Sequence, residues 1–329
     1  MKGSTSDKLR RFFALFSSEN RVLIPIQADP DSIASAMAVK RLLWRKTASI
    51  TISNINVIKR PDNIAMVRLL DVKLIQINKI DPKKYDRIVL VDSQPNHNDA
   101  FSMFTPQAII DHHPYTGAKA DYLDIRPSYG ATASILTEYL RAAKIKPSIK
   151  LATGLFHAIK TDTSNFERKT LIEDIKAFQY LFRHANIHLA HKIEQCEISF
   201  DFLKYFNIAL EKMRRRKGRI FTHVGTVTNP DACVVIADFF ARVQTVTWTI
   251  VSGFYNEMLI IILRNDGLRK NAGSVASQCF GQYGSAGGHK SMARAEIPAA
   301  ILKKEVDYRN EKKIMPWIIN HIEKRAGKK

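Results

Sequence analysis

Residues 107–114 read QAIIDHHP. The apolar run 108–110 ends on one acid and two histidines, Asp111, His112 and His113. Carboxylates and imidazoles are the side chains that most often bind divalent metals or transfer protons in proteins. Three such groups directly after a buried-looking strand therefore mark a candidate reaction site.

Acidic residues also follow other apolar segments of the first half of the chain. Strand-like VLIPI at 22–26 runs into Asp29 and Asp31, and RIVLV at 87–91 is followed by Asp92. Asp162 follows the apolar helical pattern at 149–160. Each acid alone is typical of a helix cap or a turn. In an open parallel sheet, however, ligands bind at the carboxyl ends of the strands.

Several carboxylates at one sheet edge repel one another and raise each other's pKa. A cation removes that conflict, and carboxylates combined with a neutral imidazole suit Mn²⁺ or Mg²⁺. Two such ions, about 3.5–4 Å apart, form the usual arrangement for phosphoryl hydrolysis. The acids and histidines together therefore predict a metal-dependent phosphoryl-transfer or hydrolysis site.

These side chains need a sheet to position them, and the sequence predicts an α/β fold. Apolar runs predict strands at 22–26, 50–58, 72–77, 87–92 and 107–111, and periodic patterns predict helices at 32–44, 61–70, 129–143, 149–160 and 171–184. Strands that alternate with helices indicate a mostly parallel, doubly wound sheet. The strands read as continuous apolar runs, as expected when both sheet faces are covered.

The second half predicts a smaller α/β domain. Residues 186–217 look helical and charged, so we expect a domain of 1–185, a helical linker of 186–217 and a second domain of 218–329. Within the second domain we expect a strand at 219–227, a helix at 231–243, a strand pair within 245–265, and helices at 272–281 and around 304–323.

The composition indicates a polyanionic ligand. The formal net charge is +20, which attracts nucleic acids and nucleotides. Basic residues concentrate at 40–46, at 213–219 and in the C-terminal tail. No apolar run approaches membrane-spanning length, and the three cysteines (Cys196, Cys233, Cys279) form neither a disulfide framework nor a zinc pattern. We therefore expect a cytoplasmic protein that does not bind membranes.

A glycine-rich segment at 284–289, GSAGGH, contains Gly287, Gly288 and His289. Glycines allow backbone N–H groups to approach a phosphate closely, although such clusters also simply form turns. Arg264 ends an apolar strand, where its planar guanidinium suits bidentate phosphate contacts or a surface position. Small residues at 130–134 open a helix, as an anion site or as an ordinary helix start.

Five motifs in order resemble the DHH phosphoesterase superfamily: DPDSIASA (29–36), VDS (91–93), DHH (111–113), TDT (161–163) and GSAGGH (284–289). The last motif is similar to the DHHA1 subtype of second domain. The layout is most similar to the small bacterial oligoribonuclease (nanoRNase) and 3′-phosphoadenosine-phosphate (pAp) phosphatase proteins. The resemblance covers nearly the whole chain.

The resemblance implies a role for each residue and two Mn²⁺ or Mg²⁺ ions. Asp111 would orient the histidine pair, and His113 would reach the scissile phosphate. The remaining roles are a first-metal ligand, Asp29; second-metal ligands, Asp31, His112 and Asp162; a bridge between both metals, Asp92; and substrate contacts, Arg264, Gly287, Gly288 and His289.

One position departs from the family pattern. The family places a first-metal histidine four residues before the first Asp of the DPD motif, and this chain has Pro25 there. Proline has no side-chain ligand atom, so the first metal site is expected to be weakened or completed by another residue. His97, in the loop after Asp92, is a candidate replacement.

The predicted function is hydrolysis of short RNA or DNA oligonucleotides to mononucleotides, with 3′,5′-bisphosphonucleotides (pAp) as further substrates. Two alternatives stay open at this point. One is a phosphodiesterase for cyclic or linear signalling dinucleotides, and the other is a catalytically degenerate nucleotide- or RNA-binding protein, which Pro25 favours. The sequence leaves a homodimer open.

Overall fold

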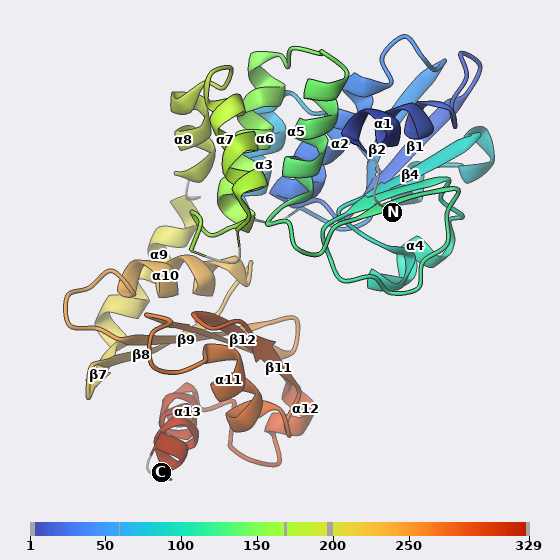
Figure 1. The fold of residues 1–329 in the computed structure, drawn as a ribbon. Helices are drawn as coiled ribbons and strands as arrows, with labels where there is room; N and C mark the ends of the chain where they lie inside the picture. The colour runs from blue at the N-terminus through green and yellow to red at the C-terminus, as the bar shows by residue number, and fades with distance from the viewer. Residues whose placement is uncertain (1–3, 59, 168–169, 196–199, 327–329) are drawn as a thin grey trace. The chain divides into compact units, whose positions relative to one another are not determined.

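The computed structural model describes residues 4–58, 60–167, 170–195 and 200–326. The chain divides into two compact units, residues 1–197 and 198–329, and each is built on its own β-sheet (Figure 1). Cys196 lies outside the described residues, whereas Cys233 and Cys279 are buried. No helix in the described ranges is both long and apolar enough to cross a membrane.

The first unit contains a six-stranded sheet in the order β3-β2-β1-β4-β5-β6, in which every neighbouring pair is parallel. The predicted parallel α/β fold is therefore confirmed. The sequence analysis missed β6, because its four residues, YLDI, do not form a continuous apolar run. The strands are β1 Arg21–Ile26, β2 Ser49–Asn54, β3 Leu74–Gln76, β4 Arg87–Val91, β5 Ala108–Asp111 and β6 Tyr122–Ile125.

Helices pack on both faces of this sheet, but unequally. The larger core joins β1, β4 and β5 to the long helices α2, α5 and α6. The opposite face has a small core in which Phe101 of α4 meets Leu90 and Ile109. The helices are α1 Thr5–Phe13, α2 Pro30–Leu42, α3 Pro61–Leu70, α4 Asp99–Ser102, α5 Thr132–Ala142, α6 Ile149–Asp162, α7 Ile172–Phe182 and α8 Ile187–Glu194.

The strand order creates a topological switch point at β1. β1 pairs with β2 on one side and with β4 on the other. The connection that follows β1 and the connection that follows β4 therefore run to opposite sides of the sheet. Crevices outside the carboxyl ends of strands at such points are the usual ligand sites of open α/β sheets. The acids after β1 and β4 lie at this position.

Pro25 sits inside β1, which is unusual because proline lacks the N–H group that a central strand donates. Its Cα pairs with Ser53 of β2, whereas the pairing of β1 with β4 extends only over Val22 and Leu23. The missing N–H therefore falls where the β1–β4 ladder has already ended. The end of this ladder is consistent with the absence of an N–H group at Pro25.

The second unit has a mixed sheet in the order β11-β12-β10-β9-β8-β7, in which only β8 and β9 run parallel. Separate apolar cores cover its two faces. Part of the glycine-rich segment is an edge strand, and the last helix starts at Glu311 rather than near Lys304. The elements are α9 Phe200–Lys212, β7 Arg214–Arg216, β8 Arg219–Thr226, α10 Asp231–Phe240, β9 Trp248–Tyr255, β10 Met258–Asn265, α11 Ala272–Phe280, β11 Ser285–Gly288, β12 Met292–Pro298, α12 Ala299–Leu302 and α13 Glu311–Ala326.

The segment predicted as a helical linker, 186–217, holds two helices and the edge strand β7. Helix α8 packs against α3 and α6 of the first unit, and α9 packs against β8 and α10 of the second. The exact domain boundaries at 185 and 217 remain predictions.

Candidate metal centre

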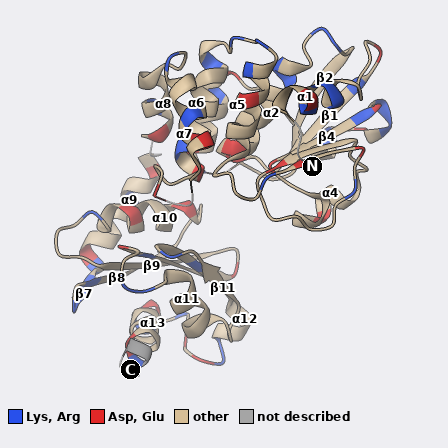
Figure 2. Cartoon of the chain, viewed as in Figure 1, with Lys and Arg blue, Asp and Glu red and all other residues tan. Residues whose placement is uncertain are grey.

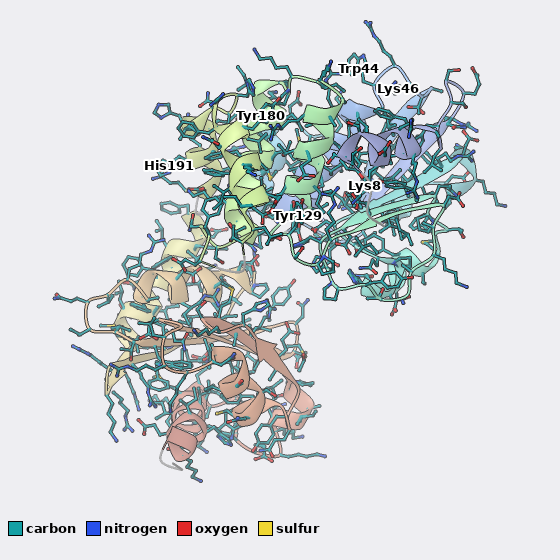
Figure 3. The ribbon with its side chains drawn as sticks, in the orientation of Figure 1. Lys8, Trp44, Lys46, Tyr129, Tyr180 and His191 are labelled. Atoms are coloured by element: carbon teal, nitrogen blue, oxygen red, sulfur yellow. The ribbon has the colours of Figure 1, made fainter. Side chains whose placement is uncertain are left out.

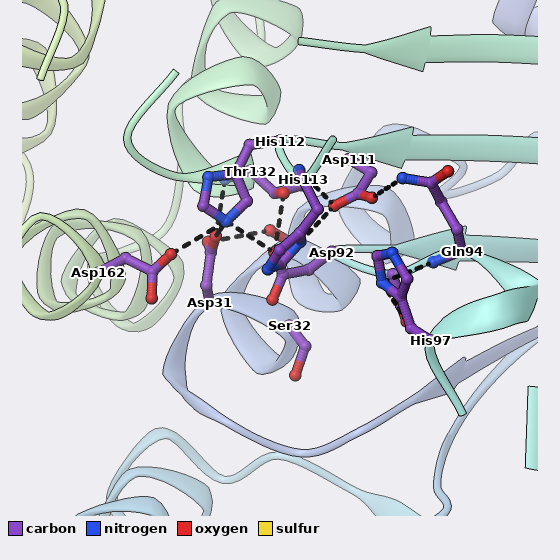
Figure 4. Close-up of polar contacts among 12 residues, drawn as sticks. Asp31, Ser32, Asp92, Gln94, His97, Asp111, His112, His113, Thr132 and Asp162 are labelled. Atoms are coloured by element: carbon purple, nitrogen blue, oxygen red, sulfur yellow. Dashed lines mark hydrogen bonds and ion pairs between the residues drawn. The ribbon is translucent and has the colours of Figure 1, made fainter. Parts of the chain in front are cut away.

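Four segments bring their acidic and imidazole groups to one place at the carboxyl edge of the first sheet (Figure 4). Asp31 lies in the first turn of α2, and Asp92 follows β4. Asp111 ends β5, and the two histidines come next. Asp162 is the last residue of α6. The ligand atoms of Asp31, His112 and Asp162 all lie within 4.8 Å of one another, and so do those of Asp92, His112 and His113.

His112 is the centre of this cluster. Its Nε2 lies 3.1 Å from Asp162 Oδ2, 3.4 Å from Asp92 Oδ1 and 4.0 Å from Asp31 Oδ2. Its Nδ1 lies 3.2 Å from the carbonyl oxygen of Tyr129, which can only accept a hydrogen bond. That contact assigns the proton to Nδ1 and leaves the Nε2 lone pair facing the three carboxylates.

Asp31 is completely buried and held by the start of α5. The amides of Thr132 and Ala133 donate hydrogen bonds of 2.7 and 2.8 Å to its two carboxylate oxygens. The small residues at 130–134 therefore do form an anion site, and its anion is a carboxylate of the same chain. Burial, followed by the charge of Asp162, raises the pKa of Asp31 to about 7.

Asp92 is buried in a backbone conformation that non-glycine residues rarely adopt, with φ of 56°. The Thr132 hydroxyl donates a hydrogen bond of 3.0 Å to its Oδ1. Burial, then the carboxylates of Asp31 and Asp29, raise its pKa well above the usual value. Backbone strain and a buried, crowded charge are costs that a folded protein retains mainly at functional sites.

Asp111 contacts the neighbouring histidine, which the resemblance expects it to orient. Its Oδ1 accepts from the backbone N–H of His113 at 3.1 Å and lies 2.8 Å from His113 Nδ1. Gln94 donates from Nε2 to the other oxygen at 2.7 Å. Burial opposes ionisation of Asp111, but the hydrogen bonds from His113 and Gln94 outweigh it and lower its pKa.

Asp29 and His97 lie at the margins of the cluster. Asp29 caps α2, because its carboxylate accepts from the amide of Ser32 at 2.9 Å. Burial, opposed by the Ser32 hydrogen bond but reinforced by Asp162, raises its pKa. The His97 ring lies 5.2 Å from that of His113, and their ligand atoms group with Asp111 within 4.8 Å.

The donor set fits a divalent cation. His112 Nε2 is buried and has no hydrogen-bond partner among the described residues, although carboxylates surround it. A buried imidazole nitrogen without a partner is costly unless another species occupies it. Burial disfavours the imidazolium form, but Asp162 and Asp31 outweigh it and raise the pKa of His112 to about 9. Either a proton or a metal ion at Nε2 therefore neutralises part of the negative charge of the surrounding carboxylates.

The second unit carries the remaining predicted residues. Arg264 forms an ion pair with Asp238 of α10, with Nε 2.6 Å from Oδ1. His289 is exposed, and its carbonyl accepts from the amide of Gly273 at the start of α11 at 2.9 Å. Gly287 has open space where a Cβ would lie, whereas Gly288 has φ of 149° and backs onto Met292. Their role in substrate binding remains a prediction.

The sequence analysis missed Thr132 and Gln94. Thr132 lies 40 residues from Asp92, and Gln94 lies 17 residues from Asp111, so no local spacing links them to their partners. The only signal was the small-residue helix start that contains Thr132.

The fold and the site define an α/β protein with a candidate divalent-metal centre at its topological switch point. Residues 21–159 match the family model described as DHH family, N-terminal domain. An uncharacterised protein of Methanocaldococcus jannaschii is 37% identical over 283 residues, which cover 86% of this chain but 58% of that protein. The chain thus spans little more than half the length of this relative.

Two solved structures have a similar fold. An exopolyphosphatase-related protein from Bacteroides fragilis superposes with a TM-score of 0.69 at 14% identity, over 91% of this chain and 93% of that one. RecJ of Thermus thermophilus, solved in complex with Mn²⁺, gives a TM-score of 0.53 at 11% identity, over 99% of this chain and 54% of RecJ. Residues 21–159 thus match the DHH family, N-terminal domain, and both superpositions show the same fold.

Proposed function

We propose that this chain is a divalent-metal-dependent phosphodiesterase that hydrolyses short oligonucleotides to mononucleotides, and that it also accepts 3′,5′-bisphosphonucleotides such as pAp. One observation carries the proposal: His112 Nε2 is buried, has no hydrogen-bond partner among the described residues, and faces three carboxylates. The match of residues 21–159 to the DHH family model and the net charge of +20 support a phosphate-containing polyanion as substrate.

The residues of the candidate metal centre have different proposed roles. Asp31, His112 and Asp162 would hold one cation, Asp29 would help to hold another, and Asp92 would be a ligand of both. Divalent ions there would supply positive charge that acidifies water and polarises the phosphoryl oxygens. Asp111 keeps His113 oriented toward the phosphate. Mn²⁺ is the cation we favour over Mg²⁺, because imidazole is a better ligand for it.

We propose that His97 supplies the imidazole that Pro25 cannot. The Gln94 amide donates to Nδ1 of His97 at 3.3 Å, which places the proton of the neutral ring on Nε2, so binding of a cation at Nε2 would displace that proton. Calorimetric titration with Mn²⁺ should give two ions per chain in the parent and one tight ion in His97→Ala. In a Pro25→His/His97→Ala double variant the second ion should return.

Hydrolysis of a labelled dinucleotide with Mn²⁺ tests the proposal. His112→Ala should lose activity by several orders of magnitude, because it removes the central ligand, while thermal unfolding checks that the variant is folded. His191→Ala, an exposed histidine of α8, is the matched control and should hydrolyse like the parent. Equal turnover by His112→Ala and the parent would refute the metal centre.

Substrate comparison separates the alternatives. We expect faster turnover of pApA and of RNA or DNA of a few nucleotides than of strands of about 20 nucleotides, whose length a compact site does not accommodate. Preferred cleavage of pGpG or a cyclic dinucleotide would instead assign a signalling phosphodiesterase. Tight binding without turnover of any of them would assign a nucleotide-binding protein.

A further inference from the structure

We propose that the first unit has a second binding site, for the phosphate backbone of a single-stranded nucleic acid, at the end of its helices remote from the metal centre. It goes beyond hydrolysis and does not depend on it. The site is termed here the basic surface and consists of Arg141, Lys144, Lys146, Arg183, His184 and His188.

The basic surface surrounds two adjoining hollows of about 400 and 600 Å³. Both shallow hollows are lined by Lys146 and His184, so they lie next to each other. The end of α5, the start of α6, the end of α7 and the start of α8 meet there. Neither lining contains an Asp or Glu residue, so nothing within the two hollows neutralises their charge.

Within the part of the fold that the structure describes, the arginines and lysines of the basic surface are not neutralised by acidic side chains. Among the described residues, Arg141, Lys144, Lys146 and Arg183 make no ion pair, and all four are exposed. Unpaired cations gain the most from a bound phosphate chain, because they release only counterions.

An aromatic side chain makes a nucleic acid a better fit than inorganic polyphosphate. Tyr180 lies beside the first hollow, with the Arg141 guanidinium 5.3 Å from its ring centre and the His184 ring 5.1 Å away. Aromatic rings interleaved with arginine are the platforms on which unpaired bases stack. A polyphosphate chain has no base to place there.

The basic surface is separate from the metal centre. Helix α5 holds Asp31 with its first amides and reaches the basic surface with its last turn. Its 11 residues span about 16 Å at 1.5 Å per residue. Figure 3 shows Tyr129, whose carbonyl faces His112, and Tyr180 at opposite ends of these helices, and Figure 2 shows Lys and Arg around the remote end. A dinucleotide at the metal centre therefore does not reach the basic surface.

Binding of a fluorescent single-stranded RNA of about 20 nucleotides, measured by anisotropy on the full chain in EDTA, tests the site without hydrolysis. The variant is Lys144→Gln/Lys146→Gln/Arg183→Gln. The matched control removes three exposed lysines elsewhere on the first unit, Lys79→Gln/Lys83→Gln/Lys84→Gln. For three lost phosphate contacts, the slope of log K against log salt should fall by about 2 in the variant.

The control should keep the parent slope, and the variant should hydrolyse a dinucleotide at the parent rate. Tyr180→Leu, which keeps an apolar side chain at the helix surface, should weaken RNA binding but not polyphosphate binding. Equal slopes for variant and control would overturn the proposal. So would a polyphosphate of equal charge that binds more tightly than RNA, because the surface would then recognise phosphate alone.

Discussion

The Thr132 hydroxyl donates a hydrogen bond of 3.0 Å to Asp92 Oδ1, while the Thr132 amide donates one of 2.7 Å to Asp31 Oδ2. One residue at the start of α5 thereby fixes two carboxylates that come from different strand ends. Both carboxylates are buried, and burial raises the pKa of each. Thr132 is thus a positioning residue for the candidate metal centre rather than a ligand.

Thr132→Val should weaken Mn²⁺ binding. Valine keeps the branched shape and the amide but removes the hydroxyl, so Asp92 loses the donor that orients it. Loss of such an outer hydrogen bond typically costs roughly 10–100-fold in metal affinity or activity. Calorimetric titration with Mn²⁺ measures the effect, and Thr132→Ser should restore affinity. A valine variant as tight as the parent would show that the hydroxyl has no positioning role.

Asp92→Asn should stabilise the metal-free protein and weaken its response to metal. Burial and the neighbouring carboxylates disfavour the Asp92 anion, and a neutral amide removes that cost while accepting from Thr132. Asparagine also tolerates the left-handed backbone at this position. A gain of about 1 kcal/mol corresponds to a rise in Tm of roughly 2–4 °C in EDTA.

Thermal unfolding with and without Mn²⁺ checks this. The parent should gain stability with metal, because a ligand that binds only the folded state raises Tm. A lower Tm for Asp92→Asn in EDTA would contradict the view that this carboxylate is destabilising without metal.

Asp124 should make stability depend on acid pH. Burial opposes its ionisation, but hydrogen bonds from Arg126, Lys8 and Tyr139 outweigh that and lower its pKa. Because the folded-state pKa lies below the unfolded value of about 3.9, its contribution is complete above that pH and is lost as pH falls through the folded-state pKa.

Asp124→Asn should therefore lower the free energy of unfolding by roughly 1.5–3 kcal/mol at pH 7. The gap between parent and variant should close below about pH 3.9. Urea unfolding at several pH values measures it. A gap that is independent of pH would show that the charge of Asp124 does not carry the effect.

Two glycines near the GGH segment should respond differently to alanine. A Cβ on Gly273 would lie 2.2 Å from the carbonyl oxygen of Gly288, so Gly273→Ala must push the segment away. Overpacking of this kind costs roughly 1–3 kcal/mol.

Gly287→Ala meets nothing within 4 Å and should leave Tm unchanged. If Gly287 lies against the substrate, its alanine variant should raise KM for a dinucleotide without a loss of stability, whereas an unchanged KM would remove it from the substrate-binding set.

Much of the first sheet was predictable, because its strands are buried on both faces and read as continuous apolar runs. β1, β4 and β5 were found for this reason, and the acids that end them fell at one edge. β6 and the edge strand β11 were missed, since YLDI and SAGG carry no such run. Such a strand is defined mainly by its hydrogen bonds to a neighbouring strand, so its own residues give little sequence signal.

The sequence by itself determined the chemistry available to this protein: which carboxylates and imidazoles follow which strands, and that a proline stands where a histidine ligand would be expected. Only the tertiary structure decided which of them meet. Thr132, Gln94 and the Tyr129 carbonyl reach the site from distant parts of the chain, because a parallel sheet brings its strand ends together regardless of their separation in sequence. The basic surface likewise combines side chains from separate helix ends, and no single basic run in the sequence predicts it.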